Sequence, residues 1–407
     1  MAANGGEIPL VSGGQVHESA QVPVIVATTF REVGTTGVHT HFVQVGHYLE
    51  RFGTRVSVVT PFSWARPLTY PLFAPRVILQ RLNGPASVVW YRKWHEVFLR
   101  NALKRDLASV GNCVIYAQGP LEARAALSAR QGPHQRVFLA VHFRTSQADE
   151  YAEPGRELKR DGFVFRSIRQ VERDVIPRVD GIVYVTKWAR DALLSWLPEA
   201  GAVPSTIISN FVAPSQAIAD GNDILADLVT TGRLDDRKNH RFLLDVLAAA
   251  GDAGQLLTLD IYGDGPLKRE LEHRISSLGL EGQVRLRGFR SDVRTFLPRY
   301  RAYVHAAYAE SSSLAIIEAM AAGLPIVAAG IGPVAELCDD GVEARFWPLD
   351  DTGRSARILI DLIQFEENRS KAAAAALERF HRDYDANILG PRIRSFLLGL
   401  TAVDPRR

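Results

Sequence analysis

The stretch from Tyr303 to Leu337 reads YVHAAYAESSSLAIIEAMAAGLPIVAAGIGPVAEL. Its apolar runs at 303–306 and 325–329 are typical of short buried strands, and the apolar residues between them, at 313–322, predict a helix. A shorter helix is expected at 333–337. Strands that alternate with helices in this way predict β/α/β units around a parallel sheet.

The same alternation extends along most of the chain. Near its start we expect a strand at 22–29, a Gly- and Thr-containing loop at 31–37, a helix up to Phe52 and a second strand at 55–60. A polar segment at 210–226 interrupts the rhythm, and a second β/α series follows it. The fold class is therefore predicted as α/β, with two Rossmann-like β/α/β domains that face each other across a cleft. Open α/β sheets place ligands outside the carboxyl ends of their strands, so this cleft is the expected site.

The chain is expected to divide into four units. They are a mobile tail at 1–21, an N-terminal domain at 22–211, a C-terminal domain at 212–385 and a C-terminal helix at 386–407. We expect that last helix to return to the N-terminal domain, and the helical tail to break at Gly390-Pro391. The first unit has neither the basic start nor the apolar stretch of a signal peptide.

The composition is typical of a soluble globular protein, with 46% hydrophobic and 23% charged residues among 407. A net charge of +3 does not point to nucleic acid, and no apolar run approaches the ~18 residues of a membrane span. The two cysteines, Cys113 and Cys338, are too few for a disulfide framework and are expected to be buried. A reducing, cytoplasmic location fits this usage.

Four features of the second half fall at expected strand ends. The first is Gly232-Arg233-Leu234, with Lys238-Asn239 at the start of the next helix. An arginine and a lysine beside a helix N-terminus suit a diphosphate, and the alternative is a solvated loop with Asp235 and Asp236 as partners. The second is Gly263-Asp264-Gly265-Pro266, whose glycines permit close backbone approach or simply form a turn.

The third feature is a pair of acids eight residues apart, Glu310 and Glu318. Carboxylates accept hydrogen bonds from vicinal sugar hydroxyls, including those of a ribose, and backbone amides at 311–314 add donors. The alternative makes Glu310 a helix-cap acid and Glu318 a surface charge, although an acid in so apolar a helix needs a partner. The fourth feature, Gly330-Ile331-Gly332-Pro333 followed by Glu336, is either a ligand loop or a plain strand-to-helix turn.

Taken together, these motifs resemble those of one known family. GRLDDRKN at 232–239, IYGDGP at 261–266, the two acids with EAMAAGLPIVA, and GPVAEL have the order and spacing of retaining nucleotide-sugar glycosyltransferases of family 4, which have the GT-B fold. The resemblance covers Leu228 to about Pro348. A weaker echo in the first half comprises the loop at Gly34–Gly37, His142 at a strand end, and IISNFV at 207–212.

The resemblance implies site residues in both halves of the chain. The implied catalytic residues are Arg233, Lys238, Glu310 and His142. The implied donor-binding residues are Gly34, Gly37, Gly232, Gly263, Arg287, Phe289, Ser311, Ser312, Ser313, Leu314 and Glu318. The chain departs from the family where Ser311-Ser312-Ser313 replaces the usual Gly-Phe-Gly, and where the loop after Gly341 lacks a common second glycine.

Each implied role follows the family position by position. Arg233 and Lys238 would bind the donor diphosphate and stabilise the leaving group, and Glu318 would hold the ribose. Glu310 and the amides after it would hold hydroxyls of the transferred sugar, and His142 would lie near the reacting carbon. The loop of Gly34 and Gly37 would close over the phosphates, and Arg287 to Phe289 would border the base.

The activity that the resemblance implies is transfer, with retention, of a hexosyl-type sugar from a nucleotide-diphosphate sugar. UDP is preferred on prevalence, and the acceptor would be a hydroxyl of a sugar, glycolipid or small molecule. The two cations would act without a metal ion, and no cofactor is expected. The sequence's Asp383-Tyr384-Asp385, which has the spacing of a metal motif, falls in the helical tail and is interpreted as surface charge.

Other enzyme and binding classes remain open. They are a GT-B sugar-nucleotide epimerase or phosphorylase, and a catalytically silent nucleotide-sugar-binding protein. A dinucleotide oxidoreductase would need G-x-G-x-x-G after the first strand, which 31–37 does not supply.

The acceptor side gives a weaker signal. The segment Val88–Arg105 combines aromatic with basic residues, which suits either a surface for a lipid-linked or acidic acceptor or a core-facing aromatic stripe with a solvated basic side. Peripheral contact at the inner membrane face is therefore open, and no protein partner is implied. The loop at 143–155 is a candidate acceptor or lid loop. His39, His41 and His47 have a spacing too irregular for a metal site.

Overall fold

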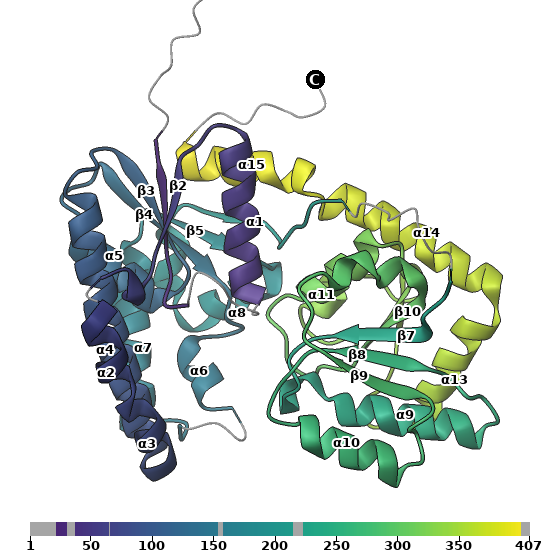
Figure 1. Cartoon of the computed structure of the whole chain (residues 1–407). Coiled ribbons are helices and arrows are strands. Elements are labelled where there is room, and N and C mark those ends of the chain that lie inside the picture. The colour runs from purple at the N-terminus through teal and green to yellow at the C-terminus, as the bar shows by residue number, and fades with distance from the viewer. Residues whose placement is uncertain (1–21, 31–36, 65, 154–157, 215–222, 400–407) are drawn as a thin grey trace, which may run out of the picture.

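The computed structural model describes residues 22–30, 37–64, 66–153, 158–214 and 223–399. They form two α/β domains that lie side by side (Figure 1). Each domain is built on a six-stranded sheet in which every pair of neighbouring strands is parallel. The predicted pair of Rossmann-like domains is confirmed.

The N-terminal sheet has the order β2-β1-β3-β4-β5-β6. Its strands are β1 (Val24–Ala27), β2 (Val56–Val59), β3 (Cys113–Ala117), β4 (Gln135–Val141), β5 (Gly181–Tyr184) and β6 (Ser205–Ile207). The central strands are short and apolar because helices cover both of their faces, as in other parallel sheets; every residue of β1, β3 and β5 is buried. The chain reverses its direction across the sheet between β1 and β3, so a crevice opens above that pair.

Eight helices surround this sheet in the described residues. They are α1 (Gly37–Arg51), α2 (Arg66–Phe73), α3 (Pro75–Leu82), α4 (Gly84–Leu107), α5 (Pro120–Ala129), α6 (Gln147–Tyr151), α7 (Phe163–Val175) and α8 (Lys187–Trp196). Helix α1 covers one face, while α4, α5, α7 and α8 cover the other. Side-chain oxygens of Asn83, Ser146 and Thr186 cap the N-termini of α4, α6 and α8, which satisfies amides that have no partner within the helix.

The C-terminal sheet has the order β12-β11-β10-β7-β8-β9. Its strands are β7 (Ala226–Thr231), β8 (Leu259–Tyr262), β9 (Val284–Gly288), β10 (Tyr300–His305), β11 (Ile326–Ala328) and β12 (Ala344–Phe346). Helices α9 (His240–Asp252), α10 (Lys268–Ser277) and α13 (Thr352–Gln364) cover one face. Helices α11 (Leu314–Ala321), α12 (Val334–Leu337) and α14 (Glu366–Asp383) cover the other. The direction of the chain reverses between β7 and β10.

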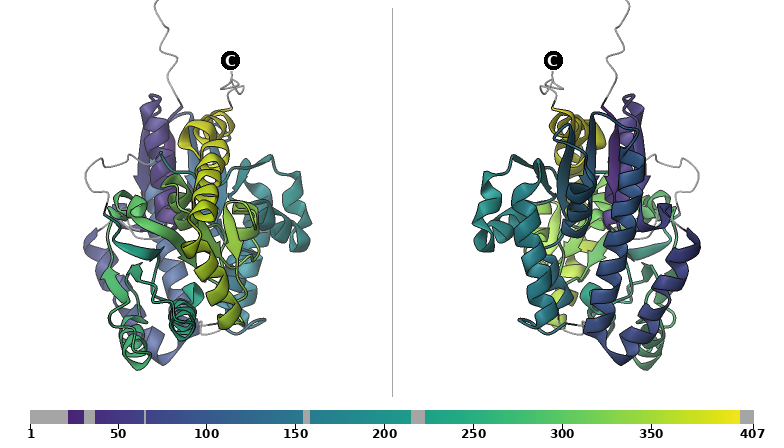
Figure 2. Two further views of the ribbon diagram at one scale, coloured as in Figure 1. Left: turned by 90° about the vertical axis from the view of Figure 1, so that its right-hand side faces the viewer. Right: turned by 90° about the vertical axis from the view of Figure 1, so that its left-hand side faces the viewer.

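The last described helix, α15 (Ala386–Leu398), crosses to the N-terminal domain. Figure 2 shows α14 and α15 succeeding one another along one side of the molecule. The side chains of Leu389, Ile393 and Leu397 join the core that α1 makes with the N-terminal sheet. This helix therefore completes the packing of a domain whose other elements lie far earlier in the chain.

The break in the helical tail lies at Tyr384 and Asp385, and the break predicted at Gly390-Pro391 is wrong. Pro391 is tolerated inside α15, where the helix is held by its packing against the N-terminal domain. A side chain at Gly390 would collide with the ring of Tyr48, 2.2 Å from the added Cβ, so glycine is needed there for close approach to α1. Asp385 ends the break by accepting a hydrogen bond from the amide of Asn387.

The burial of Asp385 corrects one interpretation of the sequence, and the burial of the two cysteines confirms another. Asp385 is buried and caps α15, so the interpretation of 383–385 as surface charge is wrong for this residue. Both cysteines are free and buried, as expected. Of the helices in the described residues, none is both long enough and apolar enough to cross a bilayer.

Candidate functional site

The loops after β7 and β10 meet where the C-terminal sheet reverses direction. The two strands are hydrogen-bonded neighbours, so their carboxyl ends lie together although 72 residues separate Lys238 from Glu310. Crevices at such reversals are the usual ligand sites of open α/β sheets. Both motifs singled out in the sequence for a diphosphate and for sugar hydroxyls open onto this point.

Lys238, Glu310 and His305 form a compact buried cluster at the reversal. The ammonium of Lys238 is paired with Glu310 Oε1, and His305 Nε2 lies 3.1 Å from the same oxygen. Burial tends to raise the pKa of Glu310, but Lys238 and His305 together lower it to about 2. Burial lowers the pKa of His305 below its ordinary value. The cluster therefore holds one carboxylate beside one ammonium at neutral pH.

The local backbone explains how Lys238 reaches Glu310. Asp236–Lys238 form a 3₁₀ turn after β7, and Asn239 follows with the left-handed φ of 52° before α9 begins. Asn tolerates this conformation better than most residues. The turn brings the carbon chain of Lys238 alongside Gly232, within 3.4 Å of where a Cβ would stand. The Lys238 side chain thus runs back over the end of β7 toward the loop after β10.

Gly232 and Gly263 lie against each other at the ends of β7 and β8. Both have positive φ, of 155° and 153°, a region that favours glycine. A Cβ on Gly263 would stand 1.8 Å from the carbonyl oxygen of Gly232. The second sequence feature is thus a close backbone contact that shapes the loop of Arg233 and Lys238, and not only a turn.

Arg233 and Lys238 have different surroundings, although they were predicted to act as a pair. The Arg233 side chain is 64% exposed, and Asp235 Oδ2 lies 3.8 Å from its Nε. Lys238 is mostly buried against Glu310. The exposed guanidinium is available to an anion, whereas the ammonium must be shared with Glu310 or leave it.

Glu318 lies in α11 and faces Arg294. The guanidinium Nε of Arg294 is 4.0 Å from Glu318 Oε1, and the same arginine donates to the carbonyl of Ala213. Burial raises the pKa of Glu318 to about 6, an effect that Arg294 only partly opposes. The partner expected for an acid in this apolar helix is therefore Arg294, and the alternative of a solvated surface charge does not apply.

The raised pKa of Glu318 has a consequence for stability. Because the folded-state pKa of about 6 exceeds the ordinary 4.5, the protonated acid favours folding below pH 4.5, and this contribution is lost as the pH rises through 6. Glu318→Gln should therefore raise the free energy of unfolding by about 2 kcal/mol at pH 8 and leave it unchanged at pH 4. Denaturant unfolding at both pH values measures this, with Glu367→Gln on the exposed side of α14 as the control. A gain that is equal at both pH values would contradict it.

The serine segment 311–313 makes contact between the two domains. The carbonyl of Ser311 accepts from Thr186 Oγ1 at 3.4 Å, and Ser312 Oγ accepts from Asn210 Nδ2 at 3.1 Å. Ser313 Oγ turns the other way and lies 3.4 Å from His305 Nε2. This segment therefore links the N-terminal domain to the Lys238–Glu310–His305 cluster.

Two other contacts cross between the domains near this segment. Gly37, the first residue of α1, lies against Leu314, whose Cδ1 is 3.8 Å from the position of a Cβ. Glu336 of α12 accepts from the backbone amides of Lys187 and Trp188, at 2.9 and 2.6 Å. A carboxylate at the N-terminus of α8 is favoured by the helix dipole. The fourth sequence feature is thus a turn whose acid caps a helix of the other domain.

His142 lies at the end of β4, inside the N-terminal half of the cleft. Its Nε2 is 3.1 Å from Gln118 Oε1, and its ring meets the ring of His41 edge-on, with centroids 4.6 Å apart. Burial and the neighbouring His41 hold the pKa of His142 well below its usual value. His142 is thus neutral and held by a side-chain amide, not by the backbone.

The remaining predicted residues lie at the edge of the site or outside the described chain. Arg287 is paired with the fully buried Asp260, 3.0 Å away, so its guanidinium is fixed by the sheet. The ring of Phe289 is largely exposed next to Gly288, whose carbonyl accepts from the amide of Gly263. Gly34 falls outside the described residues.

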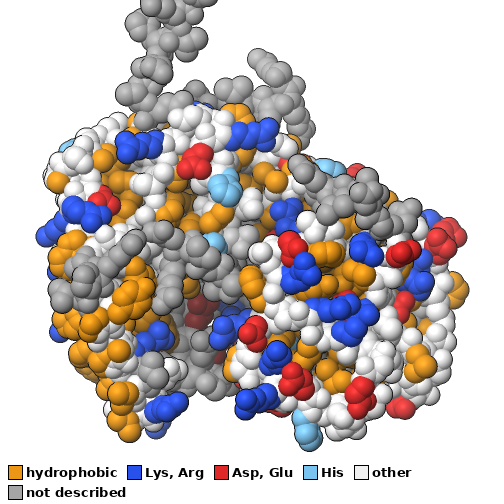
Figure 3. Space-filling view, viewed as in Figure 1, with side chains coloured by type: hydrophobic (Ala, Val, Ile, Leu, Met, Phe, Trp, Pro, Cys, Tyr) orange, Lys and Arg blue, Asp and Glu red, His pale blue; other side chains and the backbone are white. Residues whose placement is uncertain are grey.

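A hollow lies between the two domains in the space-filling view (Figure 3). A cavity of about 520 Å³ there is lined from the N-terminal side by Arg144, Glu153 and Arg160, and from the C-terminal side by Tyr308 and Ala309. Its C-terminal wall directly precedes Glu310. The cavity therefore lies next to the cluster in sequence, and Arg144, Ala152 and Glu153 of the candidate acceptor or lid loop line it.

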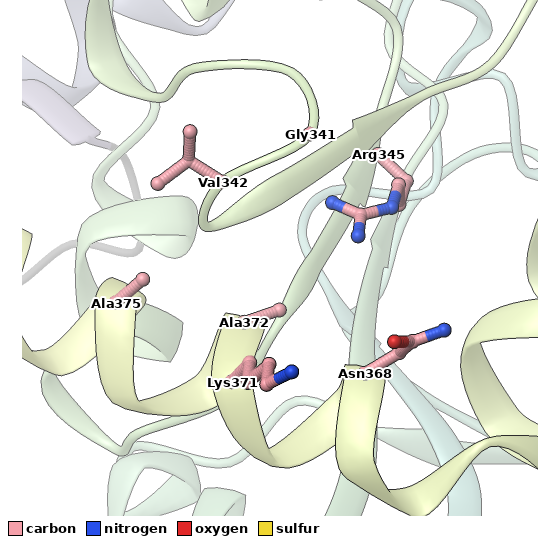
Figure 4. A pocket seen from close by; sticks show the side chains of 7 residues that line it. All are labelled: Gly341, Val342, Arg345, Asn368, Lys371, Ala372 and Ala375. Carbon is pink, nitrogen blue, oxygen red and sulfur yellow. The ribbon is translucent and has the colours of Figure 1, made fainter.

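A smaller hollow of about 300 Å³ lies elsewhere on the C-terminal domain. Figure 4 shows it between the loop of Gly341 and Val342 and helix α14. That loop precedes β12, so the hollow lies at the amino end of the strand and away from the reversal. It plays no part in the candidate site.

Comparison with known proteins matches this arrangement. Residues 35–216 match the family profile described as Glycosyltransferase Family 4, and residues 226–364 match that of Glycosyl transferases group 1. The two matches fall one in each domain and together span most of the chain. The chain belongs to glycosyltransferase family 4.

This family 4 enzyme has similar relatives over almost its whole length. It is 23% identical over 363 residues to a phosphatidyl-myo-inositol mannosyltransferase of Mycobacterium leprae, with 88% of this chain and 91% of the relative covered. Sucrose-phosphate synthase from Thermosynechococcus elongatus superposes with a TM-score of 0.73 at 17% identity, over 93% of this chain and 99% of that one. Anabaena HepE, in complex with UDP and glucose, superposes with a TM-score of 0.64 at 18% identity, over 93% of this chain and 100% of that one. The GT-B fold is thereby confirmed.

Several residues of the candidate site are not predicted by the sequence analysis. His305 ends β10 five residues before Glu310, and that spacing at a strand end was the available signal. His41 was weighed only as a metal ligand, and Asn210 only as part of a junction motif. Nothing near Glu336 in the sequence indicates that it caps α8, because its partners are 148 and 149 residues away.

Proposed function

We propose that this glycosyltransferase moves a hexosyl-type sugar from a nucleotide-diphosphate sugar to a hydroxyl acceptor, with retention of configuration. The observation that carries the proposal is the cluster of Lys238, Glu310 and His305 at the reversal of the C-terminal sheet. Arg233 is exposed beside it. A diphosphate gains negative charge as its bond to the sugar breaks, and preorganised cations stabilise that charge. A UDP-sugar is the preferred donor, in keeping with the complex formed by the Anabaena relative.

The site divides the donor between its residues. Arg233 and Lys238 bind the diphosphate, with Lys238 moving between Glu310 and the phosphate oxygens. Glu310 then accepts hydrogen bonds from hydroxyls of the transferred sugar, and Glu318 accepts from the ribose. His142, which is neutral, approaches the sugar from the N-terminal side of the cleft. The leaving phosphate itself helps to deprotonate the acceptor on the same face, so no covalent intermediate on the protein is required.

The proposed chemistry uses no metal ion. Within the described residues, no three His, Cys, Asp or Glu side chains are placed to hold one, and the cations Arg233 and Lys238 serve the diphosphate in its place. The acidic and basic groups of the cluster are already paired with one another in the structure, because Lys238 and His305 both contact Glu310.

A ligand screen tests this proposed function. UDP-, GDP-, ADP- and TDP-sugars are compared by thermal shift, because a ligand that binds only the folded state raises its stability by mass action. We expect one nucleotide class to stabilise the protein, and turnover of that donor to persist in excess EDTA. Stabilisation by none of these donors would refute the donor assignment. Activity abolished by EDTA and restored by Mg²⁺ would refute the metal-free mechanism.

The acceptor is proposed to be a hydroxyl of a sugar, glycolipid or small molecule, with contact at a membrane surface. Helices α2 and α3 present exposed apolar side chains beside basic ones, seen as a gathering of hydrophobic groups in Figure 3. The apolar ones are Tyr70 of α2 and Ile78 and Leu82 of α3. Such a surface suits an anionic bilayer, and the mycobacterial relative is named for a lipid acceptor. Cosedimentation with phosphatidylglycerol vesicles tests this contact.

The aromatic residues of α4 do not form that surface. Trp90 donates to the carbonyl of Leu72, and Phe98 is buried in contact with Trp94 and Phe73. The segment 88–105 therefore packs its aromatic side inward under α2 and α3, which matches the alternative of a core-facing stripe.

A further inference from the structure

Four polar side chains form a continuous hydrogen-bonded chain from the N-terminal sheet to the serine segment. Tyr116 of β3 bonds to His41 of α1 at 2.9 Å, and His41 bonds to Asn210 at 2.8 Å. Asn210 then donates to Ser312 of the other domain at 3.1 Å.

The first three members of the chain are buried, which fixes their bonding. Tyr116, His41 and Asn210 have exposed fractions of 0%, 2% and 4%. Buried polar groups must be paired, because an unpaired donor or acceptor loses its hydration without compensation. Burial also lowers the pKa of His41 to about 4. The imidazole is therefore neutral at physiological pH and has one N–H donor and one nitrogen acceptor.

These constraints give the chain a direction. The amide of Asn210 lies with Oδ1 toward His41 Nδ1 and Nδ2 toward Ser312. His41 therefore donates through Nδ1 and accepts at Nε2 from the hydroxyl of Tyr116. Asn210 donates to Ser312 Oγ, so the serine hydroxyl serves as an acceptor within the chain. Its own proton is not used by any of these bonds.

Ser312 lies among residues that connect both domains to the candidate site. Ser312 is half-buried, and its neighbours in the chain are tied to both domains: Ser311 to Thr186 and Ser313 to His305. His305 in turn contacts Glu310. In the sequence, Ser312 follows Glu310 by two positions, and Glu310 is proposed to hold hydroxyls of the transferred sugar. The resemblance described above usually places phenylalanine at this position, so the hydroxyl is a departure from the family pattern.

We propose that Asn210 and His41 are positioning residues that orient the Ser312 hydroxyl toward an oxygen of the transferred sugar. This rests on the proposed function and names a specificity element of the same site. The N-terminal domain thereby takes part in recognising the donor sugar by a second route, beside the contact proposed for His142. It acts through Asn210, which holds Ser312 only when the two domains are in contact as they are here.

Variants at Ser312 and Asn210 test the inference with the UDP-, GDP-, ADP- and TDP-sugars of the thermal-shift screen, each paired with its free nucleoside diphosphate. The pair that stabilises the wild-type protein is used. Ser312→Ala should weaken binding of the nucleotide sugar roughly two- to tenfold, the range for one neutral hydrogen bond, and leave binding of the free nucleotide unchanged. Ser312→Thr keeps a hydroxyl and should restore affinity. Ser277→Ala is the matched control, because Ser277 is exposed on α10 and bonds only to its own helix.

A double-mutant cycle separates positioning from a general structural role. Asn210→Ala should show the same selective loss as Ser312→Ala, and the double variant should lose no more than either alone, because both remove one interaction. Additive losses, or an equal loss for sugar-bearing and free nucleotide, would overturn the inference. So would a Ser312→Ala protein with unchanged preference for the nucleotide sugar. A wild-type protein that none of these pairs stabilises would refute the proposed function as well.

Discussion

Lys238→Ala is expected to lower turnover by on the order of 10²–10³-fold, the usual cost of removing one preorganised charge from a transition state. In the free protein the ammonium is paired with the buried Glu310, and in the proposed reaction it moves onto the diphosphate. Without it, the carboxylate loses its cation and the leaving group keeps only Arg233. Steady-state kinetics with the donor found by thermal shift measure the change.

A lysine outside the site provides the control for the Lys238 variant. Lys371→Ala removes an ammonium that is 72% exposed on α14, where it pairs with Glu367 one helical turn away. Such pairs contribute little, so its turnover should match the wild type. Far-UV circular dichroism shows whether the Lys238 variant is folded. A folded Lys238→Ala protein with turnover within threefold of the control would remove Lys238 from the mechanism.

Gly263→Ala should have the largest effect on the fold around the site. Its Cβ would stand 1.8 Å from the Gly232 carbonyl oxygen, so the loop that carries Arg233 and Lys238 must shift. We expect a loss of about 3 kcal/mol or more in the free energy of unfolding, from steric overlap together with an unfavourable φ. Denaturant titration measures it, and the nucleotide-induced thermal shift should disappear.

Gly279→Ala isolates the conformational part of that cost. Gly279 also has a positive φ, although at 67° it is smaller than the 153° of Gly263, and no atom lies within 4 Å of the added Cβ. Its replacement should cost about 1 kcal/mol, the usual penalty of a side chain in this region. If the two variants were equally stable, the close contact between Gly263 and Gly232 would not matter.

Much of the fold could be predicted because the strands are short apolar runs and the helices have regular apolar spacing. The elements that escaped prediction lack these signals. Helix α5 (PLEARAALSA) is rich in alanine and shows no clear apolar face, and α2 contains Pro71. The proline at 391 suggested a break, but tertiary packing against α1 holds the helix through it. Local propensity is a weak guide where packing decides.

For the site, the sequence supplied the residue types but not their partners. Arg233, Lys238, Glu310 and Glu318 stand out by motif and strand-end position. Their pairings could not be read, because they depend on which strands lie side by side: Asn210 and Ser312 are 102 residues apart, and His41 and Asn210 are 169 apart. The roles assigned to all of these residues stay predictions until the variants are measured.

The crossing of α15 has a consequence for how the molecule is made. Leu389, Ile393 and Leu397 seal a core whose other side chains are synthesised hundreds of residues earlier. During translation the N-terminal domain therefore keeps an apolar patch exposed until the second domain has been synthesised and α15 can pack against it. An N-terminal domain expressed without the rest of the chain would leave that apolar patch exposed to solvent. The same fragment with residues 386–398 joined to it by a linker would have the patch covered again.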